Sequence, residues 1–415
     1  MTSYQLTVDR ELLAGLFTRS EAMGELVEQL VNQLLAAQAS EQLKAEPYER
    51  TPDRQGHRNG YRERSLTTRF GSLVLEVPRI RGSALQTELF ERYQRSEQAL
   101  IATLVEMVVN GVSTRKVKAI TEELCGVELS RSTVSDLCKR LDPLVQGWNE
   151  RDLSTEVYPF LLVDALVIRV RIEGRVRQQS LLLATGVNAR GYREVLGVQL
   201  GDSESQASWG SFFTWLQGRG LQGVDLVVSD DHAGLVKAIH QQFQGASWQR
   251  CQTHMTRNLC DACPKAVWPE LHPRLRLLFT APDLTTARWV LADLLREFED
   301  RAPQAMALLE DAFDDLMAVM ALPSAYRKRL RTTNGVERLN EEIRRRERVI
   351  RIFPNRESAL RLLGTVLQEL DEAWSGGYRY FDMAAYWAWR AAPPHQTDRG
   401  SIPPAGGADA LTAAA

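Results

Sequence analysis

Residues 158–201 read YPFLLVDALVIRVRIEGRVRQQSLLLATGVNARGYREVLGVQLG. The stretch contains three runs rich in β-branched and large apolar residues, and two turn signals separate them, at Glu173-Gly174 and at residues 188–191. Runs of this length joined by short turns predict three antiparallel strands in sequence order. We therefore expect a meander that forms one part of a sheet.

The residues after this meander alternate between helix and strand. A helical run covers residues 204–216, and the short apolar strand VDLVVS follows at residues 224–229. A second helical run begins after Asp230, and a further strand lies near Trp248. Three antiparallel strands, helix, strand, helix, strand is the element order of a ribonuclease H-like core, so we predict an α/β catalytic core whose first part spans residues 151–254.

The remainder of the chain is predicted to be mainly helical. Residues 255–330 have helical propensity throughout and predict an all-α insertion domain. Residues 331–392 return to the core with a helix that begins near Thr333. Pro, Gly and Ala dominate residues 393–415, which predicts a disordered tail.

Residues 1–96 combine an amphipathic helix with a basic β-hairpin. The helix covers residues 20–46 and is expected to pack on its own domain or on a second copy of the chain. Turn signals at Asn59-Gly60 and Phe70-Gly71 and alternating apolar residues toward Pro78 predict the hairpin. The apolar stripe of the helix consists of Met23, Leu26, Leu30 and Leu34.

Residues 97–150 are predicted to form a helix-turn-helix region. A short turn precedes Ser130, which can cap the second helix. That helix offers Arg131, Ser132 and Thr133 near its N-terminus, where recognition helices meet base edges. An ordinary structural helix pair is the alternative, because such pairs are common in helical proteins.

Arginine is concentrated in two parts of a chain whose net charge is only -2. Seven arginines lie between Arg54 and Arg81, and seven more lie between Arg338 and Arg356. Arginine forms forked contacts that suit phosphate and guanine edges, although a solvated charged face is the simpler explanation for either patch alone. From these patches and from the helix-turn-helix, the residues expected to contact double-stranded DNA are Arg58, Arg62, Arg64, Arg69, Arg79, Arg81, Arg131, Ser132, Thr133, Arg338, Arg344 and Arg345.

The composition favours a soluble protein. Hydrophobic residues make up 44% and charged residues 25% of the chain, and no apolar run approaches the roughly 20 residues of a membrane-spanning helix. The first residues lack the pattern of a secretory signal, and five cysteines are too few for a disulfide framework. We expect a cytoplasmic protein without a membrane partner, associated with the nucleoid if it binds DNA.

Three carboxylates are candidates for catalysis. Asp164 lies in the middle of an apolar strand, where an isolated charge is costly unless it is paired or bound to a metal. Asp230 follows the strand VDLVVS at its carboxyl end, with Asp231 as an alternative ligand or helix cap, and Glu337 lies in the first turns of an arginine-rich helix. Hard oxygen ligands of this kind suit two Mg²⁺ ions, with Mn²⁺ as a substitute, in an in-line displacement on DNA.

Seven stretches of the chain are similar to those of one enzyme family. They are GHRNGYRERSLTTRFGSLVLEVPRIRG (56–82), YPFLLVDALVIRVR (158–171), REVLGVQLGDSES (193–205), VVSDDHAGL (227–235), RCQTHMTRN (250–258), TTNGVERLNEEIRRR (332–346) and FPNRESALRLL (353–363). On these motifs the chain resembles the prokaryotic Mutator-family insertion-sequence transposases, from about Tyr48 to Trp374. The resemblance implies an enzyme that binds the terminal inverted repeats of its element, cleaves DNA strands and joins them to target DNA.

The resemblance also implies roles for individual residues. The family's catalytic, metal-binding triad corresponds to Asp164, Asp230 and Glu337. Its Cys-x-x-His pair corresponds to Cys251 and His254, which would shape the site. Many relatives have a TNAIES-like run where this chain has TNGVERLN, so that an arginine, at position 338, replaces a small polar residue. Because two DNA ends must be brought together, a homodimer is expected.

Other functions and roles remain open at this level. A DNA-binding regulator with an inactive core and a nuclease or resolvase of the same fold are the competing functions. Cys251, His254, Cys260 and Cys263 have ligand types that suit zinc, although the gap between the two pairs is short. His232 is expected to cap a helix or to support a neighbouring site residue rather than to act as a proton shuttle. Four tryptophans are expected to pack in the interior rather than to stack on bases, namely Trp209, Trp215, Trp248 and Trp268.

Overall fold

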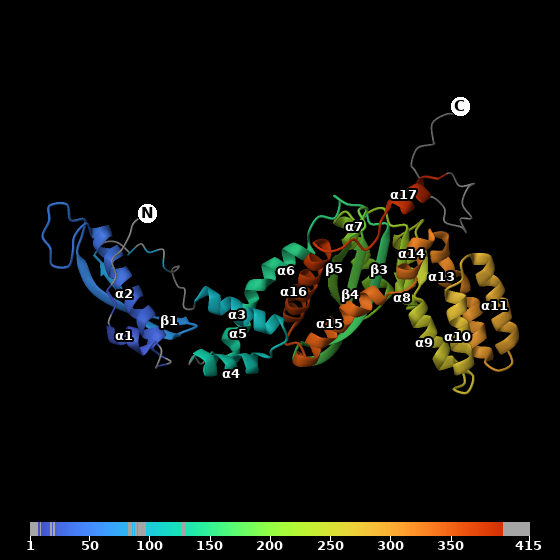
Figure 1. Cartoon of the computed structure of the whole chain (residues 1–415), viewed down its shortest axis with the longest axis horizontal. Coiled ribbons are helices and arrows are strands. Elements are labelled where there is room, and N and C mark those ends of the chain that lie inside the picture. Colours follow the sequence, from blue (N-terminus) through green and yellow to red (C-terminus); the bar gives the residue numbers. More distant parts are fainter. Residues whose placement is uncertain are drawn as a thin grey trace, which may run out of the picture. The chain divides into compact units, whose positions relative to one another are not determined.

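The computed structural model divides into two compact units, residues 1–140 and 141–415 (Figure 1). The predicted tail at residues 393–415 lies outside the described residues. The residues that the structure describes are 7, 8, 10–16, 19, 21–81, 85, 87, 89, 97–125 and 129–392.

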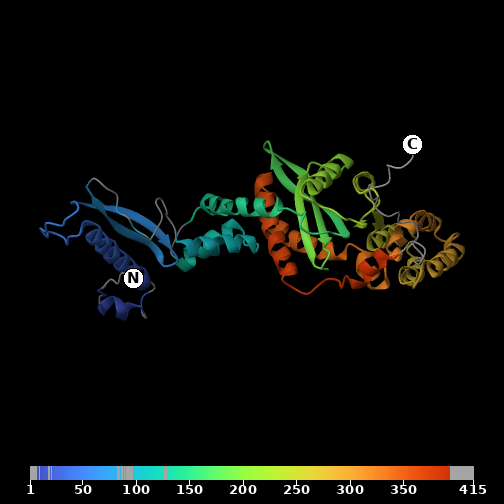
Figure 2. The same cartoon turned by 90° about the horizontal axis from the view of Figure 1, so that it is seen from above.

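The first unit begins with a helix packed on a two-stranded hairpin (Figure 2). The strands are antiparallel, as predicted, and the helix covers their apolar face with Leu35 against Leu73 and Leu75. This packing removes a continuous apolar strip from water and joins the helix and the hairpin into one body. The elements are α1 (Arg10–Gly15), α2 (Ala22–Leu43), β1 (Arg58–Thr68) and β2 (Gly71–Ile80).

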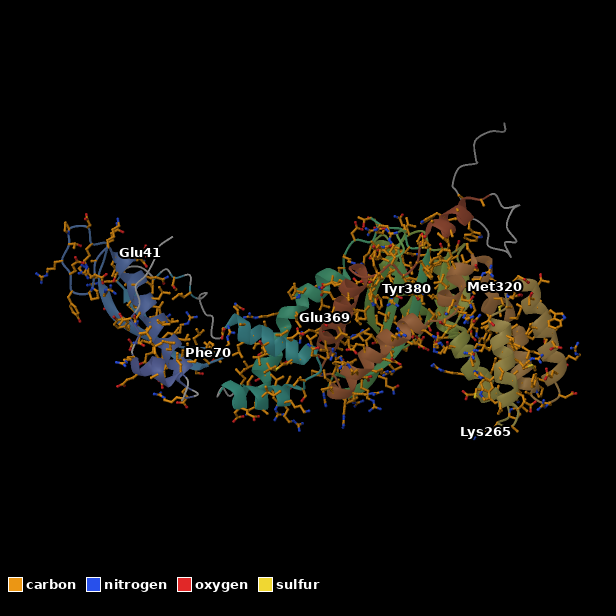
Figure 3. The ribbon with its side chains drawn as sticks, viewed as in Figure 1. Glu41, Phe70, Lys265, Met320, Glu369 and Tyr380 are labelled. Carbon is orange, nitrogen blue, oxygen red and sulfur yellow. The ribbon has the colours of Figure 1, made fainter. Side chains whose placement is uncertain are left out.

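The predicted apolar stripe of α2 is wrong at Met23, and its other three residues, Leu26, Leu30 and Leu34, are half-buried. Met23 is exposed, and the residues that face the hairpin are instead those that follow Gly24 at helical spacing. The helix passes so close to the hairpin turn that a Cβ at Gly24 would lie 2.6 Å from the carbonyl oxygen of Phe70, which Figure 3 labels. Only glycine permits this approach, so a single small residue selects the buried face. That face includes Gly24, Val27, Val31, Leu35 and Ala39.

Three short helices complete the first unit. They pack around an apolar centre that includes Leu104, Val117 and Val134. Ser130 caps the third helix, because its Oγ accepts a hydrogen bond from the backbone N–H of Thr133 at 3.0 Å. The helices are α3 (Gln98–Val109), α4 (Thr114–Cys125) and α5 (Arg131–Cys138).

The second unit is built on a five-stranded mixed sheet with the order β5-β4-β3-β6-β7. The first three strands in sequence pair antiparallel, and β6 and β7 run parallel to β3. These pairings and the intervening helices follow the element order predicted from the sequence, and the α/β class is confirmed. The strands are β3 (Phe160–Ile172), β4 (Arg175–Val187), β5 (Arg193–Gly201), β6 (Leu226–Ser229) and β7 (Ser247–Arg250).

Helices cover both faces of this sheet (Figures 1 and 2). On one face, α7 (Gln206–Gly218) and α8 (Ala233–Gln242) bury Trp209, Phe213 and Val163 in an apolar core. On the other face, α15 contacts β3, while α16 packs on β5 and β3. The helices of this second face are α6 (Asp142–Asn149), α15 (Asn334–Ile350), α16 (Arg356–Ser375) and α17 (Ala384–Ala391), and the short helix η1 (Lys139–Leu141) spans the boundary between the two units.

The chain between β7 and α15 is helical and has its own apolar core. That core includes Leu259, Leu275 and Phe298. The predicted helical segment at residues 255–330 lies within this part of the chain. Its elements are α9 (Gln252–Ala262), α10 (Trp268–Phe279), α11 (Leu284–Phe298), α12 (Pro303–Asp311), α13 (Phe313–Met317), η2 (Ala318–Ala321) and α14 (Ser324–Leu330).

Helix α6 belongs to the second unit, although the sequence placed it in the helix-turn-helix region ending at residue 150. Asp142 accepts hydrogen bonds from the guanidinium of Arg361 on α16, the shorter one from Nε to Oδ1 at 2.5 Å. A Cβ at Gly364 would lie 2.3 Å from the Val145 side chain, so the two helices are in close contact. The chain therefore leaves the first unit before α6 begins.

A buried aspartate connects three elements of the second unit. Asp371 on α16 accepts hydrogen bonds from the indole N–H of Trp148 at 2.9 Å and from the backbone N–H of Val195 at 2.6 Å. The guanidinium of Arg151 lies 3.3 Å from Oδ2, the oxygen that also accepts from Trp148. One carboxylate thus fixes α6 and β5 to α16. Within the described residues, every helix is too short or too polar to span a membrane.

Candidate active site

The sheet brings Asp164 and Asp230 side by side. β3 pairs in parallel with β6, and Leu162 lies opposite Val228. Asp164 and Asp230 each lie two residues further along. Because side chains alternate between the faces of a sheet with a period of two, Asp164 projects from the face of Leu162. Asp230 follows the end of β6 and is near enough for its charge to raise the pKa of Asp164. The register therefore places the two acids next to each other, on the face that α15 covers.

Burial and mutual repulsion perturb Asp164. Burial and the negative charge of Asp230 raise the pKa of Asp164 to about 6, against the hydrogen bonds that stabilise its charged form. One of those bonds comes from the backbone N–H of Ala165 to Oδ1 at 2.9 Å. The other comes from Nδ2 of Asn340 on α15 to Oδ2 at 2.6 Å. The strand and the helix together therefore fix the orientation of this carboxylate.

The neighbouring strand β7 brings one more residue, Cys251, to the two aspartates. Ser229 lies opposite Arg250, and the backbone N–H of Cys251 donates to the carbonyl of Ser229 at 2.7 Å, which places Cys251 beside Asp230. The Cys251 Sγ accepts hydrogen bonds from both the backbone N–H and the hydroxyl of Thr333, each at 3.3 Å. This contact ties the end of β7 to the residue that precedes α15.

His254 adds a basic group beside the two acids. Neighbouring Cys251 raises the pKa of His254, burial opposes the rise, and the charges of Asp164 and Asp230 raise it further. For Cys251, burial acts to raise the thiol pKa, but hydrogen bonds from His254 and Thr333 leave it below its usual value. The Cys-x-x-His pair thus lies at the carboxylates, whose negative charges favour the protonated form of the imidazole.

Glu337 lies at the start of α15, on the same side of the helix as Asn340, since residues three apart are neighbours on a helix. Its Oε1 is 3.4 Å from the guanidinium of Arg257 on α9. The hydroxyl of Thr253 donates to Oδ1 of Asn334 at 3.0 Å, one turn earlier on both helices. α9 therefore flanks the first turns of α15 and holds Glu337 in an ion pair.

The pair of aspartates fits a divalent cation. The Oδ1 atom of Asp230 is buried and has no hydrogen-bond partner in the described part of the chain. Two adjacent carboxylates with one free buried oxygen supply the hard ligands that Mg²⁺ prefers. However, no three His, Cys, Asp or Glu side chains among the described residues are close enough to share an ion. Glu337 is thus not brought together with Asp164 and Asp230 as the sequence led us to expect.

Two nearby groups differ from the sequence analysis. Asp231, considered as an alternative ligand, is held by Arg250 at 2.9 Å. His232 precedes α8 without making a side-chain capping bond, and its Nδ1 lies 3.7 Å from Glu204. Burial and the charge of Asp230 raise the pKa of Glu204. The sequence analysis missed Glu204, whose only signal was its position in the GDSES motif.

The zinc alternative does not fit the helix that carries its ligands. Cys251 precedes α9 and Cys263 follows it, so the two thiols lie at opposite ends of a helix roughly 16 Å long. Cys260 is exposed. These residues cannot surround one ion.

Comparison with known protein families shows which family the chain belongs to. A family model described as "Transposase, Mutator family" matches residues 1–377. The chain belongs to the Mutator family of transposases. A Staphylococcus aureus relative, the transposase for insertion sequence element IS256 in transposon Tn4001, is 43% identical over 379 residues, which cover 90% of this chain and 97% of that protein. The resemblance predicted from the motifs is thereby confirmed.

Two further relatives and one solved structure complete the comparison. The Rhizobium meliloti transposase for element ISRM5 is 45% identical over 89% of this chain and 92% of its own length. The Mycobacterium tuberculosis transposase for element IS1081 is 39% identical over 94% of this chain and 95% of its own length. The Drosophila P element transposase strand transfer complex aligns at 11% identity over 75% of this chain and 88% of that chain, with a TM-score of 0.29, which is too low to transfer residue positions.

The hairpin arginines of the transposase lie partly on its packed side. The register pairs Arg62 with Val77 and Arg64 with Leu75, so both arginines project from the face that α2 covers. Arg62 is nevertheless exposed at the edge, whereas Arg64 is half-buried. The exposed hairpin arginines are Arg62, Arg69, Arg79 and Arg81.

Two hairpin arginines already have partners in the first unit. Arg58 is half-buried and donates to the hydroxyl of Ser40 at 2.6 Å. Arg69 forms an ion pair with Glu97 at 2.6 Å. To bind a phosphate, Arg58 must release or share its contact with Ser40, and Arg69 must release or share its contact with Glu97.

The start of α5 is open to solvent. Arg131, Ser132 and Thr133 are exposed, while Val134 is fully buried in the helix cluster. The predicted recognition residues are thus accessible, and the helix that carries them is fixed by Val134.

The arginines of α15 have different surroundings. Arg338 is exposed. Arg344 donates to the carbonyl of Val167 at 2.8 Å and so anchors α15 to β3. Arg345 forms a two-bond contact with Glu342, at 2.9 Å from Nε and 2.7 Å from Nη2.

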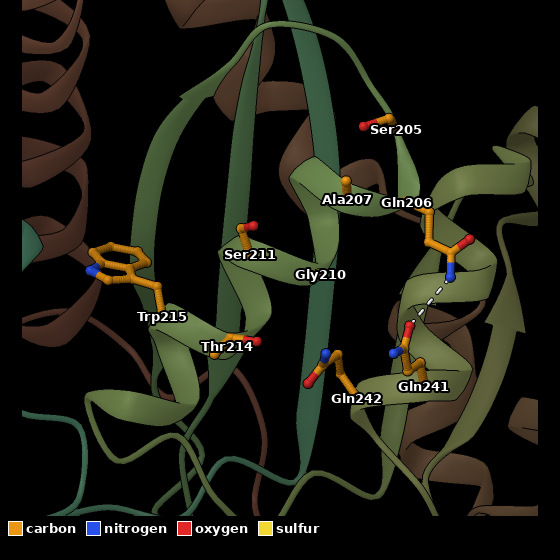
Figure 4. Close-up of a pocket in the computed structure, with 9 residues that line it drawn as sticks. All are labelled: Ser205, Gln206, Ala207, Gly210, Ser211, Thr214, Trp215, Gln241 and Gln242. Atoms are coloured by element: carbon orange, nitrogen blue, oxygen red, sulfur yellow. Dashed lines mark hydrogen bonds between the residues drawn. The ribbon is translucent and has the colours of Figure 1, made fainter.

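The four tryptophans singled out in the sequence are mainly packing residues, as expected. Trp209 and Trp248 are buried in the core between the sheet and α7–α8. Trp215 and Trp268 are half-buried and pack against apolar clusters. Trp215 also lines an open groove on α7 and α8, which Figure 4 shows.

Replacing Asn340 with alanine is expected to lower the strand-cleavage rate about tenfold and to leave DNA affinity unchanged. The change removes the hydrogen bond that orients Asp164 and one route by which α15 is held over β3. Cleavage rate and Kd are measured separately on the same duplex. Glu341→Ala, at the exposed next position of α15, is the control. Equal rates for the two variants would contradict the positioning role.

Proposed function

We propose that the second unit of this transposase is a ribonuclease H-like catalytic core with an all-α insertion, and that it cleaves DNA strands and joins them to a target. The observation that carries the proposal is the parallel register that sets Asp164 beside Asp230. Both lie under α15, where Asn340 orients the first of them. Asp230 follows the carboxyl end of β6, where sites in α/β sheets commonly lie, and Asp164 lies within β3 beside it.

Asp164 and Asp230 would hold a divalent cation, with Glu337 as the third acid of the catalytic set. Mg²⁺ ions, two in number and replaceable by Mn²⁺, would when bound activate the attacking oxygen and stabilise the leaving oxygen of an in-line displacement. For Glu337 to join the pair, its ion pair with Arg257 must open. A DNA phosphate that takes over Arg257 would release Glu337 toward the aspartates.

The chain's own groups have defined tasks in this proposal. Asn340 keeps Asp164 turned toward Asp230. His254 places a basic group beside the two acids and Cys251 positions His254 at the end of β7. Together these residues keep the acids close to each other in spite of their repulsion.

The exposed arginines of the hairpin and the start of α5 would bind double-stranded DNA at the terminal inverted repeats of the element. Arg79, Arg81 and Arg131 are exposed and suit phosphate contacts. Arg338 and Arg345 on α15 would hold the strand near the carboxylates. Pairing of two element ends calls for a homodimer, and the site of action would be the nucleoid in the cytoplasm.

The decisive experiment incubates the purified transposase with a labelled duplex that carries the element's terminal repeat, together with target DNA. In Mg²⁺ or Mn²⁺ we expect nicked and joined products, and in EDTA we expect neither. Glu337→Gln should bind the duplex and produce no product, because it loses a charged ligand. Nicking without joining would instead favour a nuclease or resolvase, and binding without either product would favour a regulator with an inactive core.

A further inference from the structure

We infer that a small pocket beside the carboxylates holds one nucleotide of the DNA strand next to the phosphate that is cut. The pocket lies between α9, α10 and the start of α15 and has a volume of about 210 Å³. The inference rests on the proposed function, because it names a contact of the same DNA. It assigns the binding to residues of the helical segment, which the sequence analysis had not connected with DNA.

The chemistry of the pocket points to an anion. Its lining includes Arg276, Arg331 and His272 and contains no carboxylate. In the described part of the chain the guanidinium of Arg276 has no ion-pair partner, so its charge faces the opening uncompensated. Arg331 is half-buried and is held in place by donating to the carbonyl of Phe279 at 2.7 Å. Two forked cations at one opening suit a phosphate group.

The floor of the pocket suits the rest of a nucleotide. Leu275 and Phe279 contribute apolar surface, and Leu275 is almost fully buried beneath it. Hydroxyls of Thr253 and Thr256 lie on the wall. A phosphate on the arginines with a sugar or base on Phe279 would satisfy both parts of the lining, whereas a free inorganic anion would leave the apolar part uncovered.

The position of the pocket relates it to the acids. Thr253 and Asn334 form its inner wall, joined by their 3.0 Å hydrogen bond. Directly after Thr253 comes His254, which senses the charges of Asp164 and Asp230, and one turn after Asn334 comes Glu337. The pocket and the carboxylates thus lie on neighbouring sides of the same two helix starts. A strand that crosses the carboxylates can place its adjoining nucleotide in the pocket.

The larger groove on α7 and α8 provides a contrast (Figure 4). All of its lining side chains are uncharged, and they include Ser211, Thr214, Gln241 and Gln242. Such a surface offers a phosphate no countercharge. Of these two hollows, the smaller one therefore matches DNA.

The test combines a charge deletion in the protein with charge deletions in the DNA. Arg276→Gln removes an exposed cation of the pocket. Arg288→Gln on α11 is the matched control, because it removes an exposed arginine that is already paired with Asp314 at 3.1 Å. A series of duplexes carries the terminal repeat, each with a single uncharged methylphosphonate linkage at a different position near the cut. Binding is measured by fluorescence anisotropy and cleavage on a gel.

We expect one linkage position at which the uncharged linkage lowers the affinity of the wild type and of Arg288→Gln about tenfold. At the same position the uncharged linkage should leave the affinity of Arg276→Gln unchanged. Arg276→Gln should bind unmodified DNA about tenfold more weakly than Arg288→Gln does. Additive losses at every position, or equal binding by the two variants, would overturn the inference. DNA binding can be measured whether or not the DNA is cleaved. If the affinity losses of Arg276→Gln and of one uncharged linkage are not additive and no cleavage occurs, the inference about the pocket stands and the proposed function is rejected.

Discussion

Asp164→Asn is expected to lower strand cleavage and strand joining by about a thousandfold or more and to change DNA affinity less than about twofold. The substitution keeps the shape of the side chain and removes its negative charge. Asparagine offers one acceptor oxygen, whereas Asp164 uses two oxygens to accept from Ala165 and Asn340. The variant therefore loses both the charge that would bind the cation and part of the orientation.

A measurement without DNA separates this role from a structural one. A ligand that binds only the folded state raises the melting temperature, so Mn²⁺ should stabilise the wild type and have a smaller effect on Asp164→Asn. Asp231→Asn is the matched control, because Asp231 is exposed and paired with Arg250. It should retain cleavage and the response to Mn²⁺. A cleaving Asp164→Asn variant would remove the basis for the catalytic assignment.

Asp371→Ala is expected to give the largest loss of stability, about 3–5 kcal/mol in the free energy of unfolding of the second unit. The change leaves the indole N–H of Trp148 and the backbone N–H of Val195 without their acceptor. It also removes one of the two carboxylates near Arg151, which keeps Glu194 at 3.8 Å. Buried donors that are left without partners are costly.

Urea unfolding followed by tryptophan fluorescence measures this loss, and the melting temperature should fall by about 10 °C. The control is Glu372→Ala at the next position, where the side chain is exposed. It should change the free energy of unfolding by less than about 0.5 kcal/mol. Similar midpoints for the two variants would mean that Asp371 does not hold α6 and β5 to α16.

The order of strands and helices along the second unit was predictable because its signals are local. Turn residues at Glu173-Gly174 and apolar runs on both sides of them define β3 and β4 without any knowledge of the fold. The two aspartates could be chosen for the same reason, since each interrupts or ends an apolar strand. Their direct adjacency could not be read from the sequence, because it depends on the parallel register between β3 and β6.

Other features depend on contacts between distant residues. The helix α2 has two apolar stripes at helical spacing, and the tight passage of Gly24 over Phe70 decides between them. Asn340 looked like an ordinary polar residue of a charged helix until α15 was placed over Asp164. Glu337 was predicted to join the aspartates, but its ion pair with Arg257 holds it in another contact.

The contact between Cys251 and Thr333 has a consequence for how relatives of this chain can be compared. The two residues are 82 positions apart in the chain, yet Sγ and the backbone nitrogen are 3.3 Å apart. The intervening polypeptide leaves the end of β7 and returns beside it, and its elements α13 and η2 also pack on β7. Its number of residues can therefore grow or shrink without moving the acids in space. In relatives with a longer or shorter intervening segment, an alignment anchored on the counterparts of Cys251 and Thr333 would locate the helix that corresponds to α15. A search at a fixed number of residues after the second aspartate would miss it.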